Sequence, residues 1–164
     1  MRTFALAAVA VAGLAASASA QPILLFADLS GLNEVPPNTS PATGRVNGVF
    51  DPATNVFSFS WNITGLTGTP AAPGSHIHRG VAGVNGPVIF GFNNPGGSWP
   101  LSGSASWNVP AAEVNALLNQ GLYFNFHTTT FPGGEVRGQI QVVPTPAALA
   151  VLGMGGLLAA RRRR

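Results

Sequence analysis

Two residue types that carry much of protein chemistry are missing: none of the 164 residues is a cysteine, and all eight basic residues are arginine. The absence of cysteine excludes a disulfide scaffold, a thiolate zinc site, an iron–sulfur cluster and a cysteine nucleophile. The absence of lysine excludes Schiff-base chemistry and Walker-type phosphate binding. Charged residues are also scarce, at 8% against about 25% in a typical soluble domain. Hydrophobic residues reach 46%, so the chain is not intrinsically disordered.

The net charge of +3 arises from the ends of the chain and not from its middle. Arg2 and the run 161–164 supply five of the eight arginines. The region 21–141 holds three arginines against five acidic residues, so its own net charge is −2. A nucleic-acid-binding surface needs clustered basic residues, and this region has no such cluster. We therefore expect no nucleic-acid partner.

The first twenty residues have the three zones of a secretory signal peptide. Arg2 supplies the positive start, Phe4–Ala16 the apolar stretch, and Ala18-Ser19-Ala20 the small-residue cleavage site. A short membrane anchor is the alternative, but the apolar run is short for a spanning helix. We therefore expect signal peptidase to remove residues 1–20 and the domain at 21–143 to be exported to the periplasm, the outer surface or the medium.

Residues 144–164 have the pattern of a sorting or anchoring segment. The fourteen uncharged residues 147–160 would span about 21 Å as a helix, against a bilayer core of about 30 Å. The four arginines that follow would hold this end in the cytoplasm. A proline motif, an apolar helix and an arginine cluster resemble the PEP-CTERM sorting tails of Gram-negative envelope proteins, with Pro144-Thr145-Pro146 in place of Pro-Glu-Pro. That resemblance implies an exosortase-type processing enzyme, and a plain C-terminal membrane anchor is the alternative.

The region between the two tails shows the period-two pattern of strands. Phe57, Phe59 and Trp61 alternate with polar residues, which places one face of the run in a core and the other in water. A turn cluster at 51–55 separates this run from a second one, so the two predict a hairpin. Short strands at intervals of about ten residues predict an antiparallel sandwich or barrel. The strands are expected at 23–30, 46–50, 57–64, 87–92, 102–109, 122–127 and 135–142.

One segment departs from this rhythm and predicts a single short helix at 111–120. Pro110 stands at its start and Gly121 just past its end, which is the usual asymmetry of helix termini. Val114 and Leu117 share a face at helical spacing. We expect the helix to cover one end of the sandwich or barrel.

His76-Ile77-His78 is the first candidate for chemistry. If this segment is extended, both imidazoles leave the same face of the strand. Metal sites on sheets use this spacing, and imidazole suits zinc or copper. The alternative is a pair of exposed histidines in a glycine-rich loop.

The last predicted hairpin supplies the second candidate. In its simplest register His127 faces Glu135 and Asn125 faces Arg137, all on one polar face. That face is either a solvated sheet surface, which composition favours, or a site. A salt bridge to Arg137 is the competing use of the Glu135 carboxylate. The candidate metal ligands are therefore His76, His78, His127 and Glu135.

Four motifs in the chain, in this order, resemble the CHRD domain, named from chordin: FADLSGLNEVPP, PATGRVNGVFDPATN, SHIHRGVAGVNGPVIF and GLYFNFHTTTFPGGEVRGQI. The resemblance runs from about Phe26 to Ile140. It implies an all-β, immunoglobulin-like Greek-key domain, which occurs in an extracellular antagonist of bone morphogenetic proteins and in exported bacterial proteins. No catalytic residues are established for this family. Its hallmark positions here are 33–36, His76, His78, His127 and 132–135, and Arg79 stands where many members have glycine.

Two functions remain open from the sequence. The first, which we favour, is a non-enzymatic envelope module that binds a surface partner or matrix polymer, with metal binding as an added property. The second is a mononuclear zinc or copper protein or redox enzyme, because three imidazole nitrogens and one oxygen ligand complete a tetrahedral centre. Hydrolase chemistry has little support, since the chain has no G-x-S-x-G elbow and no clearly positioned carboxylate pair.

The leader predicts where the mature protein begins. Protein isolated from the cell envelope should start at Gln21, because cleavage follows the small residues that end at Ala20. N-terminal sequencing or intact mass measures this directly. An intact Met1 on envelope material would contradict the assignment.

Overall fold

The structure is a computed structural model that describes residues 21–92 and 99–144. The predicted signal peptide and the predicted apolar helix and arginine cluster of the tail lie outside these residues. In chain order the described elements are β1 (Ile23–Ser30), the 3-10 helix η1 (Gly31–Asn33), β2 (Thr43–Asp51), β3 (Val56–Thr64), β4 (Pro70–Arg79), β5 (Val88–Gly91), β6 (Ser102–Asn108), α1 (Ala111–Leu118), β7 (Leu122–Thr128), β8 (Val136–Gln139) and β9 (Gln141–Val142).

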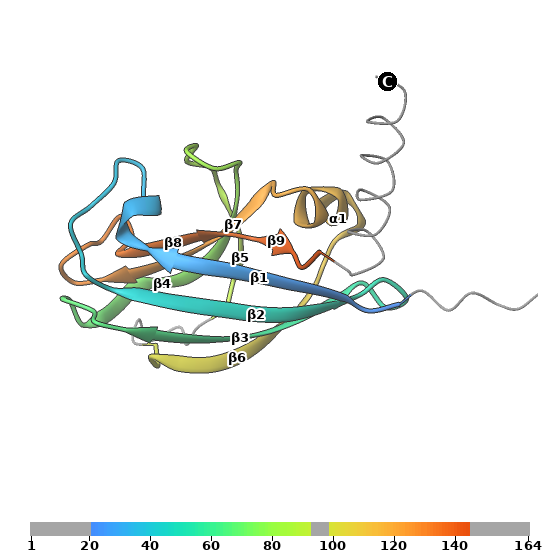
Figure 1. Ribbon diagram of the computed structural model, residues 1–164, viewed down its shortest axis with the longest axis horizontal. Coiled ribbons are helices and arrows are strands. Elements are labelled where there is room, and N and C mark those ends of the chain that lie inside the picture. The colour runs from blue at the N-terminus through green and yellow to red at the C-terminus, as the bar shows by residue number, and fades with distance from the viewer. Residues whose placement is uncertain (1–20, 93–98, 145–164) are drawn as a thin grey trace, which may run out of the picture.

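The strands form one antiparallel sheet in the order β5-β4-β7-β8-β1-β2-β3-β6. The sheet curls into a nearly closed barrel, and Figure 1 shows β1, β2, β3 and β6 as one curved layer of it. β9 follows β8 directly and pairs with β1. Some neighbouring strands are not consecutive in the chain: β3 lies beside β6, and β4 lies beside β7. Such pairs require crossover connections of the Greek-key kind. The predicted all-β fold is confirmed.

The predicted hairpin is present as β2 and β3. The two strands pair without interruption from Thr43 opposite Thr64 to Asp51 opposite Val56, so β2 begins three residues earlier than expected. The turn between them is fixed by Asp51, whose Oδ1 accepts a hydrogen bond from the Ala53 amide at 2.9 Å. This is the local role that the turn composition predicts.

The inward side chains fill the barrel with an aromatic core. Phe57, Phe59 and Trp61 are exposed by only 1%, 4% and 5%, as their alternation predicts. They contact aromatic residues of β7 from the opposite wall, with ring centroids 4.9 Å apart between Phe59 and Phe124 and 6.2 Å apart between Trp61 and Phe126. The core therefore joins the two halves of the curled sheet.

The predicted helix is present as α1, but it ends at Leu118, two residues early. Gln120 adopts a left-handed conformation with φ of 57°, and the Gly121 amide donates to the Ala116 carbonyl at 2.8 Å. The chain reverses one residue before the glycine because Gln120 takes the left-handed position. Leu117 is fully buried against the core, as its spacing predicts. Within the described part of the chain, no helix has the length and apolar character that crossing a membrane requires.

Strand β4 is missing from the seven predicted strands. Prolines and glycine occupy its first half, where the pairing with β7 shifts register between Pro70 and Ser75 and Gly74 has φ of 107°. Its second half is regular and lies between β7 and β5. The sequence 76–78 is therefore part of the sheet and not a loop.

Removing the Trp61 side chain should destabilise the fold strongly. Trp61→Ala empties a large core volume and removes the hydrogen bond from Nε1 to the Pro100 carbonyl, which measures 2.9 Å. We expect a loss of about 3–5 kcal/mol in the free energy of unfolding. Ser60→Ala, at the exposed neighbouring position, should change it by no more than about 0.5 kcal/mol. Urea unfolding of both variants checks this, and equal midpoints would contradict the packing.

Candidate metal centre

The outward face of β7 is buried although it points away from the barrel core. Every residue of β7 is buried, so alternating side chains enter the core and a second, polar environment outside the barrel. Residues 31–38 and 80–87 cover this outer face. The prediction of a solvated surface here is therefore wrong. We call the buried outward set the polar layer: His76, His78, Tyr123, Asn125, His127 and Arg137.

Arg137 fixes the first covering segment, residues 80–87, above the sheet. Its Nη2 donates to the carbonyls of Val84 at 2.8 Å and Val81 at 3.1 Å, and its Nη1 donates to Asn85 Oδ1 at 3.2 Å. The guanidinium also lies over the Tyr123 ring, 3.4 Å from its centroid. Only 1% of Arg137 is exposed, so these contacts replace its hydration.

Gly86 connects this covering segment to His78 and Tyr123 of the polar layer. Its amide donates to the Tyr123 hydroxyl at 3.2 Å, and its carbonyl oxygen lies 2.9 Å from His78 Nδ1. A Cβ at this position would lie 1.6 Å from the Arg79 carbonyl oxygen. Glycine is thus required for the close approach of the backbone.

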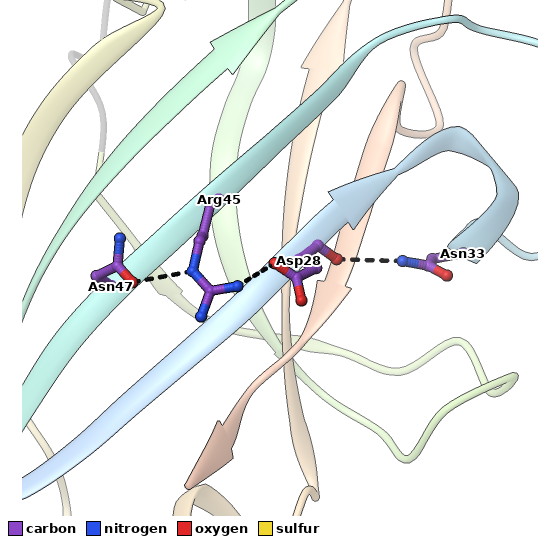
Figure 2. Close-up of polar contacts among 4 residues, drawn as sticks. All are labelled: Asp28, Asn33, Arg45 and Asn47. Atoms are coloured by element: carbon purple, nitrogen blue, oxygen red, sulfur yellow. Dashed lines mark hydrogen bonds and ion pairs between the residues drawn. The ribbon is translucent and has the colours of Figure 1, made fainter. Parts of the chain in front are cut away.

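The second covering segment, residues 31–38, is held by asparagine side chains. Figure 2 shows Asn33 reaching the Asp28 carbonyl, at 3.2 Å, beside the pair of Arg45 with Asp28 on the outer face of β1 and β2. Asn33 Nδ2 also lies 3.0 Å from the Arg137 carbonyl. Asn38 donates to two carbonyls of the loop before β8, both at 3.1 Å. Because each amide bonds to backbone, the segment is tied to the ends of two strands.

The three histidines of the chain meet inside the polar layer. His76, His78 and His127 each offer a ring nitrogen, and these three atoms lie within 4.8 Å of one another. His76 Nδ1 is 3.3 Å from His127 Nε2. A first-row metal with nitrogen distances of about 2 Å can be bound by three donors at this spacing.

Backbone carbonyls set the tautomers of two of the rings. Nδ1 of His78 faces the Gly86 carbonyl and Nδ1 of His127 faces the Pro132 carbonyl, each at 2.9 Å. A carbonyl can only accept, so each Nδ1 carries the proton and each Nε2 presents a lone pair. The Nε2 of His78 is buried and has no hydrogen-bond partner. This is the outer-shell pattern that orients metal-binding histidines.

Both of these histidines are held in the neutral form that binds metals. Burial lowers the pKa of His78, and the Arg137 charge lowers it further, against the opposing hydrogen bond to Gly86. Burial also lowers the pKa of His127, assisted by His78 and opposed by the hydrogen bond to Pro132. A neutral imidazole needs no proton release before it binds an ion.

Glu135 does not join the histidines. The predicted hairpin register is confirmed for Asn125 opposite Arg137, but the ladder ends at Phe126 opposite Val136. The expectation that Glu135 faces His127 is therefore wrong. Gly134, with φ of 130°, redirects the chain before the strand begins.

The Glu135 carboxylate instead accepts five hydrogen bonds elsewhere. Ser40 Oγ and Thr128 Oγ1 donate at 2.6 Å, and the Thr67 amide and hydroxyl donate at 2.7 and 3.0 Å. The Gly68 amide donates at 3.3 Å. The competing salt bridge to Arg137 is also absent, since the ion pairs of the described residues are Arg45–Asp28 and Arg79–Glu113.

Glu34 is a buried acid of the site that the pattern of ligand-type residues does not identify. It is exposed by 7% and lies beside Asn125, with Asn125 Nδ2 at 3.5 Å from its Oε2. Burial raises the pKa of Glu34 to about 7, although Arg137 and Asn125 oppose the shift. The sequence held two signals for it, the hallmark positions 33–36 of the family resemblance and an acid inside an otherwise uncharged stretch, 31–38, but neither places it against β7.

The geometry defines a small all-β domain with an aromatic core inside a barrel and a buried polar layer outside it. The chain belongs to the CHRD domain family, whose model matches residues 25–140. The match covers most of the described residues, including both covering segments and all three histidines. A search of curated proteins gave no match.

Glu135→Gln should destabilise the domain at neutral pH. The neutral amide replaces one acceptor oxygen with an NH2 group that faces the donors around it. We therefore expect the free energy of unfolding to fall by about 2–4 kcal/mol. Burial raises the pKa of Glu135, but the hydrogen bonds from Ser40, Thr128 and Thr67 outweigh it and bring the pKa below 4.5. The wild-type advantage is therefore complete above pH 4.5 and disappears as pH falls through the lowered pKa. Urea unfolding of both proteins from pH 7 to pH 3 checks this, and a constant difference would contradict it.

Proposed function

We propose that this CHRD domain is an exported, non-enzymatic module of the cell envelope that binds one zinc or copper ion through His76, His78 and His127. The observation that carries the proposal is the convergence of three buried ring nitrogens within 4.8 Å. They come from two neighbouring strands, β4 and β7, so an ion would link the two strands beyond their backbone pairing. Envelope or matrix molecules are the expected partners of such a module.

The chemistry of the donors supports zinc or copper over a hard cation. All three donors are imidazole nitrogens, whereas calcium and magnesium take oxygen ligands. The carboxylate predicted as a fourth ligand, Glu135, is satisfied by its own hydrogen bonds. The fourth position of a tetrahedral ion would then be taken by water or another small ligand.

Burial of the site supports a binding or structural role over catalysis. His76 and His78 are each exposed by 9% and His127 by 5%, and two chain segments cover the layer around them. A redox or hydrolytic centre must admit its substrate to the ion. An ion held here would instead stabilise β4, which is the strand with the weakest local sequence signal.

Export rests on the predicted leader and tail. The low charge of the domain and the absence of cysteine place no constraint on the compartment. The proposal that the tail is processed or anchored at the inner membrane, by an exosortase-type enzyme or as a plain anchor, follows from the arginine cluster at 161–164.

Metal binding is tested on protein purified without a histidine tag. One zinc or copper ion per chain should bind, and free metal at a hundredfold above Kd should stabilise the domain by about 2.7 kcal/mol. His127→Ala should weaken binding by more than about a hundredfold, because loss of even an outer-shell partner costs 10–100-fold. Elemental analysis, calorimetric titration and X-ray absorption give the stoichiometry, the affinity and the number of nitrogen ligands.

Glu135→Gln is the matched control for the ligand set. It should keep the wild-type stoichiometry and affinity, since its carboxylate lies outside the histidine cluster. Equal loss of metal in both variants would indicate that unfolding and not ligand removal abolishes binding. No bound metal and no stabilisation of the wild-type protein would refute the proposed site.

A further inference from the structure

Two buried acceptor atoms, one in the polar layer and one in the segment that covers it, face the same point without a hydrogen-bond partner. They are Oε1 of Glu34 and Oδ1 of Asn125. Both lie within 2.5 Å of the position that a Cβ on Gly134 would occupy, so they are neighbours. Two oxygens that both accept cannot satisfy one another, and each unsatisfied buried group costs about 1–3 kcal/mol.

A single proton resolves this arrangement. On the other side of the same two groups, Asn125 Nδ2 lies 3.5 Å from Glu34 Oε2. If Oε1 of Glu34 carries a proton, it can donate to Asn125 Oδ1 while Oε2 accepts from Nδ2. The two planar groups then form a cyclic pair with both hydrogen bonds made.

We propose that Glu34 is held as a carboxylic acid paired in this way with the Asn125 amide, and that the pair is a proton-sensitive latch that fastens residues 31–38 over the polar layer. The inference concerns Glu34 and its covering segment and does not depend on whether the histidines bind a metal. It adds to the proposed function a means by which pH governs access to the layer.

The surroundings of Glu34 favour the protonated form over an ion pair. Arg137 on β8 is the charged group that acts on it, but the Arg137 guanidinium is committed to the 80–87 segment and makes no ion pair with Glu34 within the described residues. Asp28 on β1 lines the same groove, but its carboxylate is paired with Arg45. His76 on β4 is paired opposite Asn125, and His127 is two residues after Asn125 on β7. Burial dominates, and it raises the Glu34 pKa to about 7.

The consequence of ionisation follows from the linkage of proton binding to the closed state. The closed form binds the proton more tightly than the open form, in which the Glu34 pKa returns toward 4.5. Closure therefore weakens as pH rises from 4.5 through about 7 and is constant above that. The bonds of Asn33, Asn38 and Asn85 to backbone carbonyls do not titrate, so they provide the closure that remains above pH 7.

The first test is a carbon-13 NMR titration of the Glu34 carboxyl in the wild-type protein, with a chelator present to remove metals. Glu34→Gln identifies the signal by its loss. A midpoint near pH 7 is expected. A midpoint near the ordinary value of 4.5 would show an ionised carboxylate at neutral pH and would overturn the proposal.

The second test is hydrogen exchange of the amides of residues 33–35 and 38, corrected for the intrinsic pH dependence; Pro36 and Pro37 have no amide hydrogen. Protection in the wild-type protein should fall by up to about tenfold for each pH unit between pH 4.5 and about 7 and stay constant above pH 7. Glu34→Gln is the matched variant, because its amide can form the same cyclic pair at every pH, and its protection should not change. Asp28→Asn removes a nearby carboxylate outside the pair and should keep the wild-type pH dependence. Identical pH dependence in the wild-type protein and Glu34→Gln would overturn the latch.

Discussion

The burial of one arginine on the outer face of the sheet determines how the candidate site is built. A guanidinium stays charged at any pH that a protein experiences, so Arg137 can be buried only if carbonyls and an aromatic face replace its water. Val81, Val84 and Tyr123 provide these contacts, and this brings the 80–87 segment down onto the strands. The same segment then delivers the Gly86 carbonyl to His78. The tautomer of a histidine is thus fixed by the contacts of an arginine two strands away.

Glu135 has the corresponding role on the opposite side of the same strands. Its carboxylate accepts hydrogen bonds from Ser40, which precedes β2, from Thr67, which precedes β4, and from Thr128 at the end of β7. One charged group therefore joins three connections that are far apart in the sequence. Its distance from the histidines leaves them as an all-nitrogen donor set. Such a set distinguishes ions by ligand chemistry, because it offers no oxygen for which calcium or magnesium would compete.

Much of the fold could be predicted from the sequence, because alternation in runs such as Phe57–Ile63 has one clear interpretation. Strand β4 could not, since prolines and Gly74 mask its periodicity and only pairing on both sides makes it a strand. The convergence of His76, His78 and His127 could be predicted, because it requires only that two strands lie side by side and present these residues on the same face. The orientation of Glu135 could not be predicted, because the positive φ of Gly134 turns the chain just before Glu135 and takes this residue out of the strand pairing. Burial of the polar face depends on covering segments that carry no periodicity at all.

The scarcity of charge in the domain takes on a physical meaning once each charged group is placed. Arg79 and Glu113 connect β4 to α1, and Asp28 and Arg45 connect β1 to β2. Asp51 closes a turn, while Arg137, Glu135 and Glu34 are buried and organise covering segments and loops. All eight charged groups of region 21–141 therefore make local contacts, and those that remain largely exposed, Asp28, Arg45 and Arg79, are ion-paired. A domain with so few charges maintains a polar layer by taking its donors and acceptors from backbone carbonyls, asparagine amides and hydroxyls. Because those groups do not titrate, the proposed effects of pH and of a metal ion on this layer both depend on the few that do, Glu34 and the histidines.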